Sequence, residues 1–141
     1  MKIRLGRIAM IGLAVMMFAV AGSAQSTDPD APTAVTDGVV TGASRGGLYD
    51  DKTYYFAINV KPGMLTQTSD LTPVKNTGGG TLRWEYLDAK FKRIKWDQMS
   101  AVNNPERRVM DTKVLAKRRV IVKVIVGGSV DFSIKFAGTA Y

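Results

Sequence analysis

The stretch that decides the fold is RRVIVKVIVGGSVDFSIKF, residues 118–136. In its first half a valine stands at every second position from Val120 to Val126, so these valines line one face of an extended strand. Ile121 and Ile125 fill the other face, which is typical of a central strand covered in part on both sides. The second half alternates in the same way, with these apolar side chains inward: Val130, Phe132, Ile134 and Phe136. The intervening Gly127-Gly128 pair predicts a two-residue hairpin turn.

The same alternation recurs upstream, between residues that favour turns. We predict further strands over residues 35–41, 53–60, 64–71, 81–87, 91–96 and 107–113. Pro62-Gly63 predicts a turn between the second and third of these, and loops are expected at residues 42–47 and 97–106. Leu82, Trp84 and Tyr86 share a face that is predicted to lie in the core. About eight strands without a helix predict an all-β fold: an antiparallel sandwich, jelly roll or barrel.

Residues 1–24 have the three parts of a secretory signal peptide. Three basic residues precede an uncharged apolar stretch at residues 8–21, and a small-residue cleavage site, Gly22-Ser23-Ala24, follows it. We therefore expect a mature protein that begins at Gln25 and is periplasmic or secreted. The alternative is an uncleaved anchor, although the apolar stretch has 14 residues and a spanning helix needs about 20.

The rest of the chain is predicted to hold one domain. Residues 25–34 are polar and proline-rich, which predicts a flexible leader, and residues 35–141 are predicted to form the β-sandwich. The whole chain has a formal charge of +8, from 20 basic and 12 acidic residues. Because three of the basic residues belong to the signal segment, 17 remain against the same 12 acids, and the mature charge is about +5.

The composition argues against an enzyme. The chain has no histidine and no cysteine, which excludes serine triads, thiol nucleophiles, iron–sulfur ligation and disulfides. Two carboxylate pairs remain, Glu85 with Asp88 and Asp50 with Asp51, but residues at odd spacing in a strand point to opposite faces. We therefore expect a non-catalytic protein.

No cofactor is predicted apart from a candidate calcium site. Calcium binds several carboxylate and carbonyl oxygens, and four aspartates are available: Asp28, Asp30, Asp50 and Asp51. Asp50 and Asp51 are the candidate ligands, because the other two lie in the predicted leader. Ordinary turn-capping by these aspartates is the alternative.

Several segments resemble the bacterial pre-peptidase C-terminal domain. The resemblance rests on DDKTYYFAINV at residues 50–60, the turn at Pro62-Gly63, and RVIVKV at residues 119–124, followed by two glycines and DFSIKFAG at residues 131–138. It implies a secreted β-sandwich of the jelly-roll type, non-catalytic, that serves as a binding module; some members carry calcium. The present chain would be a free-standing version. LRWEYLD at residues 82–88 replaces an acidic strand of the family, which argues against inherited calcium binding.

Basic and aromatic residues supply the candidate binding surface. Basic residues cluster at residues 90–96, at Arg107-Arg108, and at Lys113 with residues 117–119. Three aromatic residues are expected to be accessible: Tyr49, Tyr55 and Trp96. The candidate partner surface comprises Tyr49, Tyr55, Lys92, Arg93, Lys95, Trp96, Arg107 and Arg108. The alternative is that basic residues on exposed strands only keep sheets from pairing edge to edge.

These observations predict an exported, non-catalytic binding or interaction module. Its partner would be an envelope polymer or a protein, because an exported basic surface meets anionic polymers, lipid head groups or acidic proteins, and no nucleic-acid partner is expected. One alternative is a carbohydrate-binding module, in which exposed aromatic rings stack on sugars. Another is a structural subunit of a membrane assembly, which requires that residues 1–24 are retained as an anchor.

Overall fold

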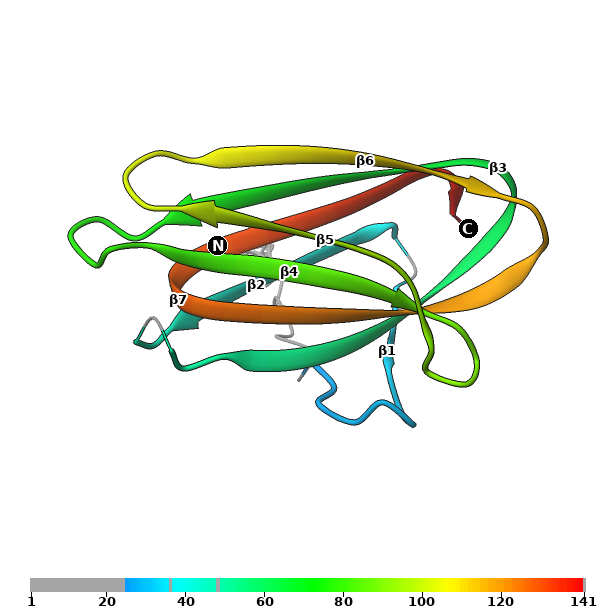
Figure 1. Cartoon of the computed structure of the whole chain (residues 1–141), viewed down its shortest axis with the longest axis horizontal. Helices are drawn as coiled ribbons and strands as arrows, with labels where there is room; N and C mark the ends of the chain where they lie inside the picture. The colour runs from blue at the N-terminus through cyan, green and yellow to red at the C-terminus, as the bar shows by residue number, and fades with distance from the viewer. Residues whose placement is uncertain (1–24, 36, 48, 141) are drawn as a thin grey trace, which may run out of the picture.

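The computed structural model describes residues 25–35, 37–47 and 49–140, and within them the fold is all-β, as predicted (Figure 1). The seven strands are β1 (Thr33–Ala34), β2 (Val39–Arg45), β3 (Lys52–Pro73), β4 (Gly80–Leu87), β5 (Arg93–Ala101), β6 (Glu106–Val114) and β7 (Arg118–Ala140). They form one mixed sheet in the order β1-β3-β7-β4-β5, with β2 paired to β7 and β6 paired to β3. No helix in the described part of the chain is long and apolar enough to cross a membrane. The predicted signal segment, residues 1–24, lies outside the described residues.

Strand β7 runs unbroken through Gly127-Gly128, so the predicted hairpin turn at this pair is wrong. Both glycines stay paired with β4, Gly127 with Thr81 and Gly128 with Gly80, and the chain turns back here within one continuous strand (Figure 1). Gly128 has a φ of 81°, and a Cβ there would collide with the Gly79 carbonyl oxygen. Only glycine satisfies both conditions at this bend.

Strand β3 bends in a comparable way at its predicted turn. Residues 52–60 pair with the first limb of β7, where Val60 meets Arg118, and residues 65–73 pair with the second limb, where Leu65 meets Gly138. In both limbs the partner numbers in β7 fall as those in β3 rise. The predicted strands at residues 53–60 and 64–71 therefore merge into β3, and the two halves of residues 118–136 merge into β7. Six of the eight predicted strands then remain, and the short β1 brings the observed total to seven.

Two predicted loops are partly wrong. The predicted loop at residues 42–47 includes the second half of β2, which pairs with β7 up to Arg45. The predicted loop at residues 97–106 includes the end of β5, because Met99 and Ala101 pair with β4 and are buried. In β2 the inward positions after Val40 are Gly42 and Ser44, which are not apolar, so the sequence shows no alternation there. The first predicted strand, residues 35–41, overlaps β2 only at residues 39–41 and begins after the end of β1.

The core has the faces that the alternation predicts. Both limbs of β3 and β7 contribute to one buried cluster, which also includes Leu82, Trp84 and Tyr86 of β4. All eight inward positions of β7 are buried: Val120, Val122, Val124, Val126, Val130, Phe132, Ile134 and Phe136. Burying each such side chain stabilises the fold by about 1.5–3 kcal/mol, so this single strand supplies much of the hydrophobic stabilisation.

A polar group lies inside this apolar core. The Tyr86 hydroxyl donates to Gln67 Oε1 at 2.5 Å, and Gln67 Nε2 donates to Ser69 Oγ at 2.8 Å. Burial raises the pKa of Tyr86, which keeps its hydroxyl protonated as the donor. The interaction links β4 to the second limb of β3, and thus orients two elements across the core.

The predicted leader is hydrogen-bonded to the domain. Gln25 Nε2 donates to the Thr41 carbonyl oxygen at 2.6 Å, and the Tyr55 N–H donates to the Ser26 carbonyl oxygen at 2.8 Å. Strand β1 pairs in parallel with β3 at Phe56 and Ala57. On the outer side of the sheet a second, small buried cluster consists of Ala57, Leu87 and Ile121, with Tyr55 packed against it. The expected cover on both sides of β7 is therefore present at Ile121.

Candidate functional site

Two of the three basic clusters of the sequence meet at one end of the molecule. Figure 1 shows three connections there: the bend of β3, the β4–β5 connection and the β6–β7 connection. The register brings Met64 opposite Lys113, and Val60 opposite Arg118. We call this region the basic end; its cations include Lys61, Lys90, Lys92, Lys113, Arg118 and Arg119.

Most of these cations lack a neutralising carboxylate. Lys61, Lys113, Arg118 and Arg119 are exposed, and no carboxylate of the described residues lies within ion-pair distance of them. Asp88 offsets part of the charge in the β4–β5 connection. Its carboxylate accepts the N–H groups of Lys92 at 2.9 Å and Lys90 at 2.8 Å, and these hydrogen bonds hold the pKa of Asp88 below its ordinary value.

Apolar side chains lie exposed among these charges. Leu115, in the β6–β7 connection, is 79% exposed, and Met64, at the bend of β3, is 52% exposed. Phe91 is exposed in the β4–β5 connection, where its backbone has a φ of 59° and its N–H donates to the Asp88 carbonyl oxygen at 2.9 Å. Exposed apolar residues next to unpaired cations are typical of a surface that contacts a partner.

A second cluster of charge lies on the outer face of β4, β5 and β7. We call it the Trp96 cluster; it consists of Arg83, Glu85, Arg93, Trp96 and Lys123. The Glu85 carboxylate is nearly buried and receives three cations, from Arg83 at 3.2 Å, Arg93 at 3.1 Å and Lys123 at 3.6 Å. Burial would raise the pKa of Glu85, but the Arg93 hydrogen bond and the charges of Lys123 and Arg83 outweigh it and lower this pKa.

Trp96 is held in place by the same arginines. The guanidinium carbons of Arg83 and Arg93 lie 4.6 and 5.4 Å from the centroid of its ring, and the residue is 44% exposed. Trp96 is paired with Glu85, which is paired with Lys123, which in turn is paired with Tyr55. Two aromatic side chains therefore flank a cation and a carboxylate in one row across four strands.

Other candidate residues hold strands together. Lys95 Nζ donates to the Asp111 carbonyl oxygen at 2.6 Å, and thereby joins β5 to β6. Arg108 forms an ion pair with Asp97 at 2.7 Å across the same two strands, and Arg107 pairs with Asp70 of β3 at 2.6 Å. The cations of these residues are therefore engaged within the fold.

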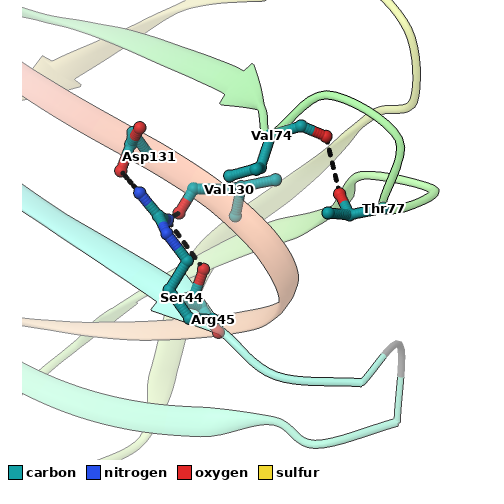
Figure 2. Close-up of polar contacts among 6 residues, drawn as sticks. All are labelled: Ser44, Arg45, Val74, Thr77, Val130 and Asp131. Carbon is teal, nitrogen blue, oxygen red and sulfur yellow. Dashed lines mark hydrogen bonds and ion pairs between the residues drawn. The ribbon is translucent and has the colours of Figure 1, made fainter.

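The opposite end of the molecule has a different character. It carries the connections β2–β3, β3–β4 and β5–β6 (Figure 1). Arg45 there is neutralised by Asp131 at 2.7 Å and also donates to the Ser44 and Val130 carbonyl oxygens, as Figure 2 shows. In the neighbouring β3–β4 connection, Thr77 Oγ1 donates to the Val74 carbonyl oxygen at 2.6 Å. Acidic residues and Tyr49, which is 99% exposed, lie at this end.

The candidate calcium ligands Asp50 and Asp51 are exposed at this opposite end. The described residues contain no group of three or more acidic side chains close enough to hold a metal ion. Asp51 lies against Gly127, where its side chain would clash with any added Cβ. Asp50 donates its N–H to the Gly47 carbonyl oxygen at 3.0 Å, as a turn residue does.

The candidate partner surface from the sequence shares only Lys92 with the basic end. Three residues of the basic end stood in neither that surface nor the basic clusters of the sequence: Lys61, Met64 and Leu115. Lys61 and Met64 flank the predicted turn at Pro62-Gly63, where a basic residue is unremarkable by itself. Leu115 stands between two predicted strands in VLAKRR, and a leucine between strands, next to basic residues, was the available signal. No family model, curated protein or solved structure matches the chain.

Proposed function

We propose that this protein is an exported, non-catalytic binding module that recognises an anionic component of the cell envelope through its basic end. The observation that carries the proposal is the unequal pairing of charge. Four exposed cations at the basic end have no carboxylate within ion-pair distance among the described residues, whereas Arg45, Arg107 and Arg108 elsewhere are paired. The opposite end also has the exposed lysines Lys52 and Lys75, but they share it with three exposed acids: Asp50, Asp51 and Glu106. A field concentrated at one end orients and accelerates the approach of a charged partner.

A finer description of the architecture supports a binding module. We infer a β-sandwich of the jelly-roll type. One layer would be β2, the second limbs of β7 and β3, and β6; the other would be the first limbs of β3 and β7, then β4 and β5. Both sets share one buried cluster, as facing layers do. The resemblance to the pre-peptidase C-terminal domain implies the same architecture and remains a prediction.

The non-catalytic part of the proposal is supported by the state of the carboxylates. Glu85 is held by three cations and its pKa is lowered, so it is a poor proton donor at neutral pH. Asp88 caps backbone N–H groups.

Binding to a soluble polyanion tests the proposal. Dextran sulfate is the probe and neutral dextran is the control, with affinity measured against salt concentration. The double variant Lys61→Gln/Lys113→Gln should lose about tenfold or more in affinity, because each unpaired cation near an anionic surface contributes about 1 kcal/mol. The matched variant Lys52→Gln/Lys75→Gln removes two exposed lysines at the opposite end and should change affinity less than twofold. Equal losses in the two variants, or binding independent of salt, would contradict the proposal.

The Trp96 cluster favours a second candidate function, the recognition of a glycan. Tyr55 and Trp96 end a row across four strands, and at about 4.8 Å per strand spacing they stand roughly 14 Å apart. Aromatic rings stack on the apolar C–H faces of sugars while neighbouring polar groups bind hydroxyls. Screening against neutral polysaccharides tests this: Trp96→Ala should abolish binding, and Ile94→Ala, at a neighbouring exposed position, should preserve it. Absence of binding by the unaltered protein would remove this candidate.

The proposal of export has its own test. Mass spectrometry of the protein isolated from its natural source should give an N-terminus at Gln25. An N-terminus at Met1 would instead support the alternative of a subunit anchored in a membrane assembly.

A further inference from the structure

We propose that the basic end docks onto the surface of an anionic lipid bilayer, with Leu115 and Met64 entering the head-group region. The inference rests on the proposed function and specifies the partner. The basic end presents apolar side chains and unpaired cations together, which is the combination that interfacial membrane contacts require.

The apolar residues lie within the charged surface. Met64 is directly opposite Lys113 in the register, and Leu115 follows Lys113 by two positions. Arg118, opposite Val60, borders the same connection on the other side. Leu115 is outside any strand and is the more exposed of the two apolar residues.

A bilayer accounts for both kinds of side chain, whereas a soluble polyanion accounts for one. The cations would contact phosphate groups of either partner. The exposed Leu115 and Met64 side chains would stay in water on a polyanion, but leave water when they enter the region between head groups and acyl chains. The apolar pair therefore favours lipid over polymer.

The shape and polarity of the molecule fit a planar partner. The three connections of the basic end lie at one end of the long axis, where the bend of β3 and the β6–β7 connection extend furthest (Figure 1). These two segments, which carry Met64 and Leu115, would meet a flat surface first. Asp50, Asp51 and Glu106 are exposed at the opposite end. An anionic surface attracts the first end more strongly than the second, where the exposed acids offset Lys52 and Lys75, and it would thereby orient the long axis away from the bilayer.

The first test compares vesicles of phosphatidylcholine with and without phosphatidylglycerol in a sedimentation assay on the full chain. Leu115→Ser/Met64→Ser should bind the anionic vesicles about tenfold less tightly and bind dextran sulfate as before. Val102→Ser/Val109→Ser is the matched control, because both valines are 57% exposed and lie outside the basic end; its binding should be unchanged. All variants share residues 1–24, so differences between them report on the altered positions.

A position-specific label provides a second readout. The chain has no cysteine, so Leu115→Cys and Val102→Cys each accept one environment-sensitive fluorophore such as NBD. With anionic vesicles, emission from position 115 should shift to the blue and be quenched by lipid-borne quenchers, while position 102 should not respond. No response at position 115, or an equal response at position 102, would overturn the inference. Dextran sulfate binding without vesicle binding would overturn it and leave the proposed function intact; loss of both would end the proposed function too.

Discussion

The Trp96 cluster and the basic end are both rich in cations, but they differ in what neutralises those cations. In the cluster one nearly buried carboxylate, Glu85, receives Arg83, Arg93 and Lys123. At the basic end the exposed Lys61 and Lys113 have no such partner in the described part of the chain. The same residue types therefore stabilise the fold in one place and remain available to a partner in the other.

This difference follows from position in the sheet. Glu85 lies on β4, with β5 on one side and β7 on the other, so cations from both neighbours reach it. At the basic end the strand residues opposite the cations carry no carboxylate: Lys113 faces Met64, Arg118 faces Val60 and Arg119 faces Asn59. Removing charge should therefore affect stability in the cluster and binding at the basic end, and the predictions below separate the two effects.

The largest effect on stability is expected from Glu85→Gln. The variant leaves three cations close together without their carboxylate and should lower the free energy of unfolding by about 2 kcal/mol; the cations are partly exposed, which keeps the loss below that of a fully buried pair. Urea denaturation measures it. The control is Glu106→Gln, an exposed acid without an ion pair among the described residues, which should change stability by less than about 0.5 kcal/mol. Equal stability of the two variants would contradict the distinction between the regions.

The pH dependence of this difference is the next prediction. Because the pKa of Glu85 is lower in the folded protein than its ordinary value of 4.5, ionised Glu85 stabilises the fold above that value. The contribution is lost as the pH falls through the folded-state pKa. The stability gap between the unaltered protein and Glu85→Gln should therefore be full at neutral pH and shrink below 4.5. Urea midpoints at a series of pH values measure this, and a gap that stays constant in acid would rule out the ion pairs as its source.

Much of the fold is predictable because alternation is a local property. The inward faces of residues 120–126 and 130–136 follow from the sequence and are buried in the structure. The path of the chain between these two segments cannot be predicted from the sequence. A glycine pair flanked by alternating runs fits both a hairpin and a bend, and at Gly127-Gly128 the choice depends on pairing with Thr81 and Gly80, more than 40 residues away.

The candidate site is less predictable, because ion pairs join residues distant in the sequence. Arg107 and Arg108 form the densest basic pair in their region, yet Asp70 and Asp97 neutralise them. Basic density alone cannot distinguish such residues from Lys61, which is a single lysine at a turn and becomes part of the basic end only through the bend of β3. The sequence contains Asp70 and Asp97, but it does not show that the pairing of strands places them beside Arg107 and Arg108.

A smaller effect is expected where an exposed arginine joins two strands. Arg108→Ala removes the ion pair with Asp97 and the hydrogen bond to the Gln98 carbonyl oxygen at 3.0 Å, and should cost about 1 kcal/mol in the free energy of unfolding. Arg118→Ala is the matched control at the basic end and should cost less than about 0.5 kcal/mol. Should Arg118→Ala prove the more destabilising of the two, the basic end would have to be reinterpreted as part of the structural framework.

The smallest effect is expected from charge reversal at the two ends. The sign of the change in the free energy of unfolding should distinguish one end from the other. Lys113→Glu places an acid among the unpaired cations, which should raise the free energy of unfolding by a few tenths of a kcal/mol, since exposed charges interact weakly in water. Lys52→Glu places an acid next to Asp50 and Asp51 in the sequence, and should lower the free energy of unfolding by a similar amount. Both lysines are exposed and lie near the end of a strand, so strand propensity cancels in the comparison. The opposite signs should converge toward zero as added salt shortens the screening length to a few ångströms. The same sign for both variants, or a difference that salt leaves unchanged, would show that the two ends do not differ in local field.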